Sequence, residues 1–566
     1  MRTRGVNPVI AGVLAVVVIV AASVWRTWDT GVNGDIMYVL GGLRAARDGG
    51  VPFDEIFVAR PFAYKCWIAA LDAVRAVFVG DPSSLAAMRV VRLTAYVVVL
   101  AVCAVLHRGL RRHVGQLPAV GAATAAAVGL LLSPRFNFLE PDWTAALAAV
   151  LAGGLLLCFA DERVACLLGG IALWLTVAMK LSTAVFAGVT VILVFLIARR
   201  RAVGGAIVGA VVSVGWYVLS RLLQPLEWRW FADQAALVHD SPIHHAPRAA
   251  DFADLTQAVL NAALMSPIVV GGVAAAALFV VRPTERRQRR ERLLVALVCV
   301  GLAVASGFAQ GEWFLYHFSD LAILAAVVWG FALGAADRFE LTALLAAPLV
   351  SGLVVAALVP SFQGHDRPRY WTLIVVTVLA ATVPAIVFWR RGPTGRSTAG
   401  RSAATLAALA AGVAFVAGMT TARPDVPLTI VGYDGRRSSA PTPESVAAHL
   451  ESQQRAGERI GARTPVLYLA YGATVYAFPN PTPCPYPSPQ WVQRTALWAQ
   501  VQTYWSFRDN LSCLTDKRAR YMVRSTSWFD LAKMPPQIRA LVAEQFDCSK
   551  QLRPAPAGLQ ICPRRR

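Results

Sequence analysis

The chain is organised around the stretch Trp28-Asp29-Thr30-Gly31-Val32-Asn33-Gly34-Asp35-Ile36-Met37-Tyr38, which follows the first long apolar segment, residues 8–27. Two carboxylates therefore stand within a few residues of a membrane surface, where a charge is costly and often marks a functional site. The alternative is that Asp29 and Asp35 only cap the helices that follow them. The rest of the chain decides between these interpretations.

The composition is that of a membrane protein. Of 566 residues, 56% are hydrophobic, which leaves room for a dozen or more spans of ~20 residues. The net charge of +21 could indicate a nucleic-acid partner, but the arginines stand in short clusters between apolar segments, as residues that fix membrane orientation do. We therefore exclude nucleic acid and expect a polytopic α-helical protein of the plasma membrane, in contact with membrane lipids.

Thirteen apolar segments are predicted as transmembrane helices: 8–27, 90–106, 118–133, 143–160, 164–179, 182–198, 203–220, 263–281, 293–309, 318–336, 341–359, 371–388 and 402–420. Basic clusters at 107–113, 199–201 and 282–292 lie between spans on one side, and the positive-inside rule makes this side cytoplasmic. The N-terminus is then cytoplasmic and the C-terminal part extracytoplasmic.

The sequence predicts a membrane module, residues 1–422, followed by a different kind of domain, residues 423–566. The second part is polar and rich in proline and aromatic residues, and it contains Cys484, Cys513, Cys548 and Cys562. Four cysteines outside the cytoplasm indicate two disulfides, with three pairings open. We expect a small α/β domain with strands at 465–470 and 521–524 and helices at 443–456 and 535–545.

On this topology the unusual polar residues gather at the outer face: Glu140, Asp142, Lys180, Trp313, Tyr316 and His317. Each has an ordinary explanation. The two acids could begin a helix, the lysine could snorkel to the interface, the histidine could be a satisfied interfacial residue, and the aromatic pair could belong to the interfacial belt. Their occurrence together on one face favours a site.

The sequence contains no G-x-x-x-x-G-K loop, no G-x-G-x-x-G between a strand and a helix, and no H-E-x-x-H. The spans also lack the ladder of buried charges that proton-driven pumps use. An outward-facing enzyme without access to cytoplasmic nucleotides needs another activated substrate, and a lipid-linked sugar meets this need.

The order of these motifs resembles the GT-C superfamily of polyprenyl-phosphate-sugar glycosyltransferases, particularly its family 39-like branch, with protein O-mannosyltransferases, lipid A aminoarabinose transferases and actinobacterial envelope transferases. The resemblance is carried by Gly34-Asp35-Ile36, Gly50-Val51-Pro52, Arg60-Pro61-Phe62-Ala63-Tyr64, Glu140-Pro141-Asp142, Lys180 and residues 311–318. The stretch from Tyr471 to Tyr476 resembles the opening of the outer domain of such proteins. Two departures are Ile36, where the family often has a second acid, and Pro61, which stands alone where the family has two prolines.

The resemblance implies inverting transfer of a sugar from a polyprenyl-phosphate donor to an envelope glycan, lipoglycan or protein on the outer face. Asp35, or alternatively Asp29, would act as general base, and Glu140 and Asp142 would orient the acceptor or support the base. The donor phosphate would be bound by Lys180, Arg60, Lys65 and His317. Substrate contacts would come from Tyr64, Trp313 and Tyr316. No cofactor is expected, and a divalent metal is left open.

The donor sugar cannot be read from these residues; mannose is favoured and arabinofuranose comes next. The alternative function is a lipid or glycan transporter, including a flippase, since thirteen spans would serve it equally well. A transporter should have inverted repeats and interrupted helices near the midplane, whereas polarity here concentrates at one face.

Overall fold

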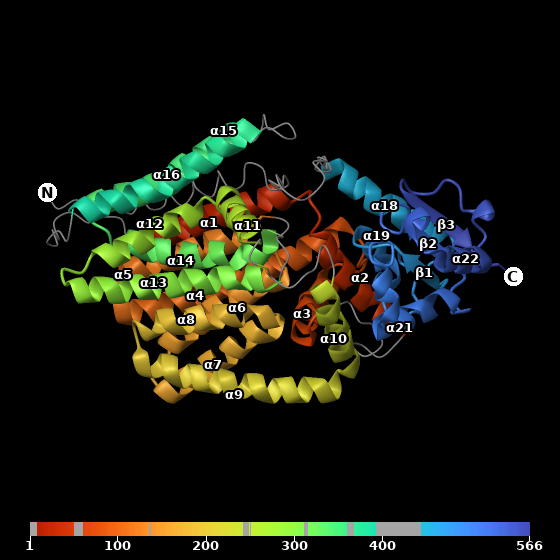
Figure 1. Ribbon diagram of the computed structural model, residues 1–566, viewed down its shortest axis with the longest axis horizontal. Coiled ribbons are helices and arrows are strands. Elements are labelled where there is room, and N and C mark those ends of the chain that lie inside the picture. Colours follow the sequence, from red (N-terminus) through yellow and green to blue (C-terminus); the bar gives the residue numbers. More distant parts are fainter. Residues whose placement is uncertain are drawn as a thin grey trace. The chain divides into compact units, whose positions relative to one another are not determined.

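The computed structural model describes residues 8–49, 60–134, 137–240, 248, 251–310, 315–358, 367–391 and 443–565 (Figure 1). The chain folds into two compact units. The first comprises Met1–Thr27, Tyr96–Gly215 and Pro247–Ala440, and the second comprises Trp28–Ala95, Trp216–Ala246 and Pro441–Arg566. The second unit thus joins the stretch after the first span to the C-terminal domain. The domain boundary predicted at 422 lies outside the described residues.

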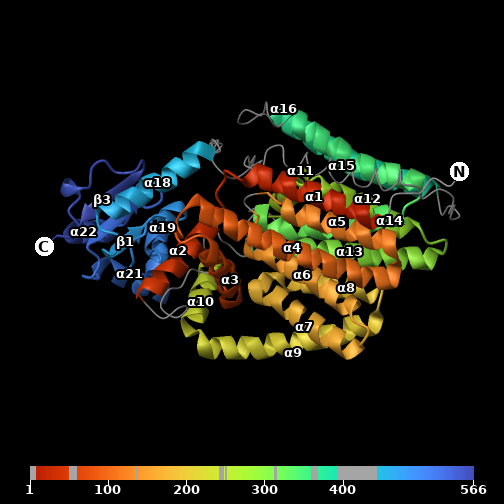
Figure 2. The same ribbon diagram turned by 180° about the vertical axis from the view of Figure 1, so that it is seen from behind.

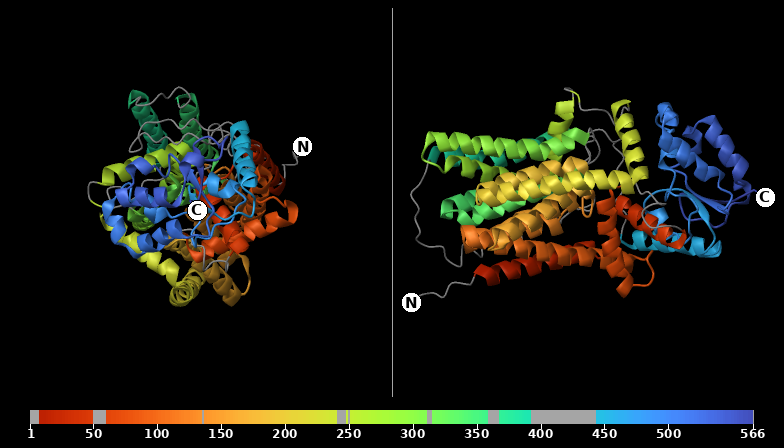
Figure 3. Two further views of the ribbon diagram at one scale, coloured as in Figure 1. Left: turned by 90° about the vertical axis from the view of Figure 1, so that its right-hand side faces the viewer. Right: turned by 90° about the horizontal axis from the view of Figure 1, so that it is seen from below.

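The first unit is helical. Its elements are α1 (Pro8–Thr27), most of α4 (Leu85–Val114), α5 (Gln116–Leu131), α6 (Pro141–Cys158), α7 (Glu162–Met179), η1 (Leu181–Thr183), α8 (Ala184–Phe195), most of α9 (Arg199–Leu223), α11 (Asp251–Met265), α12 (Ile268–Val281), α13 (Arg286–Gln310), η2 (Leu315–Phe318), α14 (Ser319–Ala335), α15 (Arg338–Leu358) and α16 (Arg367–Arg391). Figure 3 shows its long helices running nearly parallel to one another.

Within the described residues, six helices are long and apolar enough to cross a membrane, and the bent pair α11–α12 makes up to seven. Five more apolar helices, in α1, α5, α8, α15 and α16, are shorter. The protein is therefore a multi-pass membrane protein. A helix coincides with each of the first twelve predicted spans, and the thirteenth, 402–420, lies outside the described residues.

The prediction of one continuous span at 263–281 is wrong at its start. Helix α11 ends at Met265, α12 begins at Ile268, and the axis turns by 103° between them. Pro267 stands at the break, where its ring and missing N–H prevent a helix from continuing.

Small residues let helices of the first unit approach closely. A Cβ added to Gly121 of α5 would lie 2.1 Å from the carbonyl oxygen of Gly330 in α14, so no larger side chain fits there. Such packing replaces the hydrophobic driving force, which is lacking between helices in lipid. Helix α1 packs beside α5 in the same layer (Figure 2).

The second unit combines helices with a three-stranded sheet. Its helices are α2 (Gly34–Gly49), α3 (Phe62–Phe78), α10 (Pro225–Asp240), α18 (Pro443–Arg459), α19 (Ala473–Ala477), α20 (Gln490–Arg494), η4 (Ala499–Thr503), α21 (Trp505–Thr515), η5 (Leu531–Lys533), α22 (Pro536–Gln545) and η6 (Cys548–Lys550), and its strands are β1 (Val466–Leu469), β2 (Tyr521–Ser525) and β3 (Leu559–Pro563). Strand β2 is central, parallel to β1 and antiparallel to β3. The predicted small α/β domain is confirmed, with β3 as an additional strand.

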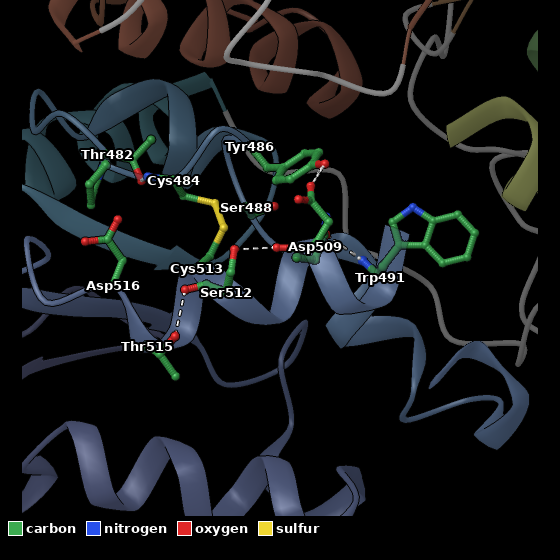
Figure 4. Close-up of a disulfide and its surroundings, with 12 residues drawn as sticks. Thr482, Cys484, Tyr486, Ser488, Trp491, Asp509, Ser512, Cys513, Thr515 and Asp516 are labelled. Atoms are coloured by element: carbon green, nitrogen blue, oxygen red, sulfur yellow. Dashed lines mark hydrogen bonds between the residues drawn. A yellow bond between two sulfur atoms is a disulfide. The ribbon is translucent and has the colours of Figure 1, made fainter. Parts of the chain in front are cut away.

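Both predicted disulfides are present, and the structure assigns their pairing. Cys484 bonds to Cys513 of α21, and Cys548 of η6 bonds to Cys562 of β3. Beside the first bridge, the Tyr486 hydroxyl donates a hydrogen bond to the Asp509 carboxylate (Figure 4). The bridges therefore tie α21 to the loop that precedes α20, and the last strand to η6.

Replacing each cysteine pair by alanine should destabilise the protein unequally. The bridges span 29 and 14 residues, for which the chain-entropy relation gives about 3.6 and about 3 kcal/mol. Thermal unfolding of the purified variants should thus show the larger loss for Cys484→Ala/Cys513→Ala. Peptide mapping that finds Cys484 bonded to Cys548 or Cys562 would contradict the assignment.

Candidate active site

The Asp35 carboxylate, in the first turn of α2, has a hydrogen-bond donor on each oxygen. Arg60 donates from Nη2 to Oδ2 at 2.6 Å, and the Tyr471 hydroxyl donates to Oδ1 at 2.9 Å. The Asp35 and Arg60 side chains keep 24% and 21% of their surface exposed. The carboxylate is therefore fixed in direction but still accessible.

Tyr471 lies in the middle of a row of three aromatic rings. The Tyr38 ring of α2 stacks on it with centroids 4.4 Å apart, and the Trp528 ring, from just after β2, lies 5.7 Å away on a nearly parallel plane. Burial, followed by the charge of Asp35, raises the pKa of the Tyr471 phenol well above its usual value. The hydroxyl therefore keeps its proton and acts as a donor.

A second guanidinium belongs to the same unit. Arg494 ends α20, donates from Nη1 to Gln234 Oε1 at 2.6 Å, and lies 4.9 Å from the centre of the Trp491 ring. Burial lowers the pKa of Arg494 to about 10, although the tyrosines Tyr38 and Tyr471 oppose this change. The side chain still carries its charge at neutral pH.

Asp29 lies in a different setting. Arg89 donates to Asp29 Oδ1 at 3.0 Å and to the Trp28 carbonyl at 2.7 Å, and its guanidinium stacks on the Trp28 ring. The Asp29 side chain is 58% exposed. It belongs to a surface ion pair that ties the stretch after the first span to α4.

Lys65 forms a buried pair with Glu227, joining α3 to α10. Lys65 Nζ lies 3.4 Å from Glu227 Oε2, and the Phe62 amide donates to Glu227 Oε1 at 3.1 Å. The side chains are 0% and 6% exposed. Burial raises the pKa of Glu227, and the charge of Lys65 opposes the rise. Tyr64 is also fully buried. Lys65, predicted to bind the donor phosphate, and Tyr64, predicted to contact the substrate, therefore have no surface open to a substrate.

The first unit holds a separate polar cluster around Lys180. From the end of α7, Lys180 Nζ donates to Asp142 Oδ2 at 2.9 Å and also to Gln310 Oε1. The ammonium lies 5.8 Å from the centre of the Tyr316 ring. Asp142 is completely buried, whereas Lys180 is 24% exposed. One ammonium thus links α6, α7 and α13.

Further acids are buried in the first unit. Asp320, in the first turn of α14, is fully buried, and neither of its carboxylate oxygens accepts a hydrogen bond from the described residues. Glu140 is fully buried and His317 nearly so. Trp313 lies outside the described residues. Where the chain is described, no group of three or more histidine, cysteine or acidic side chains is arranged to hold a metal ion.

Comparison with solved structures identifies the fold. ArnT from Cupriavidus metallidurans in the apo state superposes with a TM-score of 0.53 at 15% identity, covering 98% of this chain and 97% of ArnT. The chain has an ArnT-like fold. ArnT bound to undecaprenyl phosphate gives a TM-score of 0.52 at 16% identity, over 98% of this chain and 97% of ArnT.

The arabinosyltransferase EmbB from Mycobacterium smegmatis matches at 16% identity over 72% of this chain and 40% of EmbB, with a TM-score of 0.40. No family model and no curated protein sequence matches the chain.

Several residues of these clusters were not among the predicted site residues, among them Tyr471, Glu227, Gln310 and Asp320. The resemblance of the stretch beginning at Tyr471 to the opening of an outer domain was the one signal for the first of them. A single glutamate or glutamine near a helix end gives no signal, because such residues are common at helix termini.

Substitution of Glu227 by leucine should strongly destabilise the protein. It would leave the Lys65 ammonium buried without its partner, which costs about 3–5 kcal/mol, and adding Lys65→Met should recover much of that loss. Thermal unfolding measures both effects. The control is Glu451→Leu, which breaks an exposed ion pair with Arg455 in α18 and should cost under about 1 kcal/mol. Equal melting of both single variants would contradict the buried pairing.

Proposed function

We propose that the protein is a membrane glycosyltransferase that moves a sugar from a polyprenyl-phosphate donor to an envelope glycan, lipoglycan or protein. The proposal is supported by an ArnT-like fold over nearly the whole chain, one solved form of ArnT being bound to undecaprenyl phosphate. The observation that carries it is the accessible Asp35 carboxylate held between Arg60 and Tyr471.

Asp35 is the general base of the proposed reaction. The acceptor hydroxyl attacks the anomeric carbon and gives its proton to Asp35, while the bond from that carbon to the phosphate oxygen breaks. The lipid leaves as a polyprenyl phosphate, and one displacement inverts the anomeric centre. Asp35 is preferred to Asp29 because it is half-buried and oriented by two donors, whereas Asp29 is 58% exposed in a surface pair.

Arg60 supplies positive charge for the leaving phosphate. It reaches Asp35 through one nitrogen, Nη2, and a guanidinium has five N–H donors in a fork that suits phosphate oxygens. When Arg60 turns to a phosphate, the Asp35 carboxylate is left free to accept the proton of the acceptor hydroxyl.

The cluster in the first unit is proposed as a second anion-binding group. Lys180 is partly exposed and is held by Asp142 and Gln310, and its ammonium is suited to bind an anion such as a lipid phosphate. Glu140, Tyr316 and His317 would support this cluster or the acceptor. Lys65 and Tyr64, being buried, are assigned a structural role instead, and Trp313 stays a prediction.

The break between α11 and α12 is the feature that a transporter would share. Helix α12 starts at this break, and its 14 residues end at Val281, next to Arg282. The proposal of an enzyme therefore rests on the Asp35 site and not on this break.

The proposed orientation places the C-terminal domain and Asp35 outside the cytoplasm. It follows from the arginine-rich segment 282–292. Modification of a cysteine placed at Gln288 by an impermeant thiol reagent in intact cells would refute it.

Asp35→Asn should reduce sugar transfer roughly 10²–10⁴-fold, because the amide keeps the shape of the carboxylate but cannot accept the proton. The measurement uses purified protein with radiolabelled polyprenyl-phosphate mannose and, separately, arabinofuranose, together with envelope acceptors. Donor binding should stay near that of the wild type.

The matched control is Asp29→Asn, which should stay within a few-fold of wild-type turnover. An inactive Asp29→Asn beside a fully active Asp35→Asn would move the base to Asp29. Full activity of both variants would rule out the proposed mechanism, and mannose or arabinofuranose transfer by the wild type would identify the donor.

A further inference from the structure

The Asp35 carboxylate is held by two parts of the chain that are far apart in sequence. Arg60 is 25 residues away and Tyr471 is 436 residues away, and each binds a different oxygen. The tyrosine contact therefore brings the C-terminal domain to a residue of the first outer stretch.

The backbone fixes the place of the Tyr471 ring. Gly472, with φ of 58° and ψ of −121°, adopts a conformation that residues with a side chain rarely enter. A Cβ added to Gly472 would lie 3.4 Å from the Cα and the carbonyl oxygen of Gly34. The residues next to Tyr471 and Asp35 thus pack backbone to backbone.

A second close approach lies at Gly41, about two helical turns beyond Gly34 along α2. A Cβ on Gly41 would meet the carbonyl oxygen of Val475 in α19 at 2.5 Å. Two tight points set the register of α2 against α19, and the stacked rings of Tyr38 and Trp528 restrict rotation of the Tyr471 side chain. The direction of the Tyr471 hydroxyl toward Asp35 is therefore built into the fold.

We infer that Tyr471 is a positioning residue that orients the Asp35 carboxylate during turnover. This inference rests on the proposed function. A neutral donor favours the charged form of the carboxylate and, unlike Arg60, has no charge with which to follow a phosphate. Tyr471 can thus hold Asp35 in place when Arg60 turns to the donor.

Other charged or titratable groups face this pair. Arg60 precedes α3 and Tyr38 lies on α2, and both act on the Tyr471 phenol. Arg494, which ends α20, is acted on by Tyr471, Tyr38 and Arg60. Loss of the Tyr471 hydroxyl removes the one neutral donor to Asp35 seen here and leaves those groups in place. Removing a hydrogen bond to the charged form of a general base moves the acidic limb of a pH–rate profile upward.

The test is Tyr471→Phe, which keeps the ring in its stack and removes only the hydroxyl. A hydrogen bond to a charged group is worth enough to lower kcat roughly 10- to 100-fold and to move the acidic limb of its pH profile upward by about one unit. The donor KM should not change. The matched control is Tyr476→Phe, whose hydroxyl donates to the Ser84 carbonyl at 3.0 Å in the same stretch, and whose pH profile should match the wild type.

The outcomes separate this inference from the proposed function. An active wild type with an unmoved pH profile in Tyr471→Phe overturns the inference alone, whether or not the variant melts at a lower temperature. Absence of transfer by the wild type with both lipid-linked donors overturns the proposed function and the inference with it. A shifted acidic limb in Tyr471→Phe but not in Tyr476→Phe supports both.

Discussion

The candidate active site of the second unit is built around one charge, the carboxylate of Asp35, and the donors that surround it. A half-buried carboxylate needs hydrogen-bond donors to offset its lost hydration. Here they come from Arg60 and Tyr471, and the glycine contacts at Gly34 and Gly41 bring the C-terminal domain close enough to supply the second. The C-terminal domain is therefore part of the same compact unit as the stretch that follows the first span.

The first unit follows a different rule. Its helices are held by small residues at crossings such as Gly121 with Gly330, and its polar side chains are concentrated around Lys180. The Lys180 ammonium offsets part of the cost of burying the Asp142 carboxylate. Asp320 has no such partner among the described residues. These charged side chains lie at the ends of helices, and the Lys180 ammonium is paired with Asp142.

The membrane helices and the C-terminal α/β domain could be predicted from sequence because hydropathy and helix length are local properties. The number of disulfides could also be predicted, but their pairing could not, since spacing alone does not say which cysteines meet. The break at Pro267 was missed because the apolar composition continues across it. Apolar character reports membrane burial, not the continuity of a helix.

Of the candidate site, Asp35 with Arg60 and Asp142 with Lys180 were each named from sequence, but their pairing required the fold. Further partners come from distant segments: Tyr471, Gln310 and Glu227. The sequence around a single polar residue does not indicate which residue it will contact in the folded protein. The role of Lys65 illustrates this limit: the same lysine suits a phosphate or a buried glutamate, and Glu227 became visible as its partner only in three dimensions.

The most direct test of this account is a structure of the protein in a lipid nanodisc with a non-transferable polyprenyl-phosphate sugar. The account predicts that Arg60 contacts the phosphate and that the Asp35 carboxylate, still bonded to Tyr471, lies about 3 Å, or one water further, from the position of the attacking hydroxyl beside the anomeric carbon. A donor bound with its anomeric carbon far from Asp35 would contradict it.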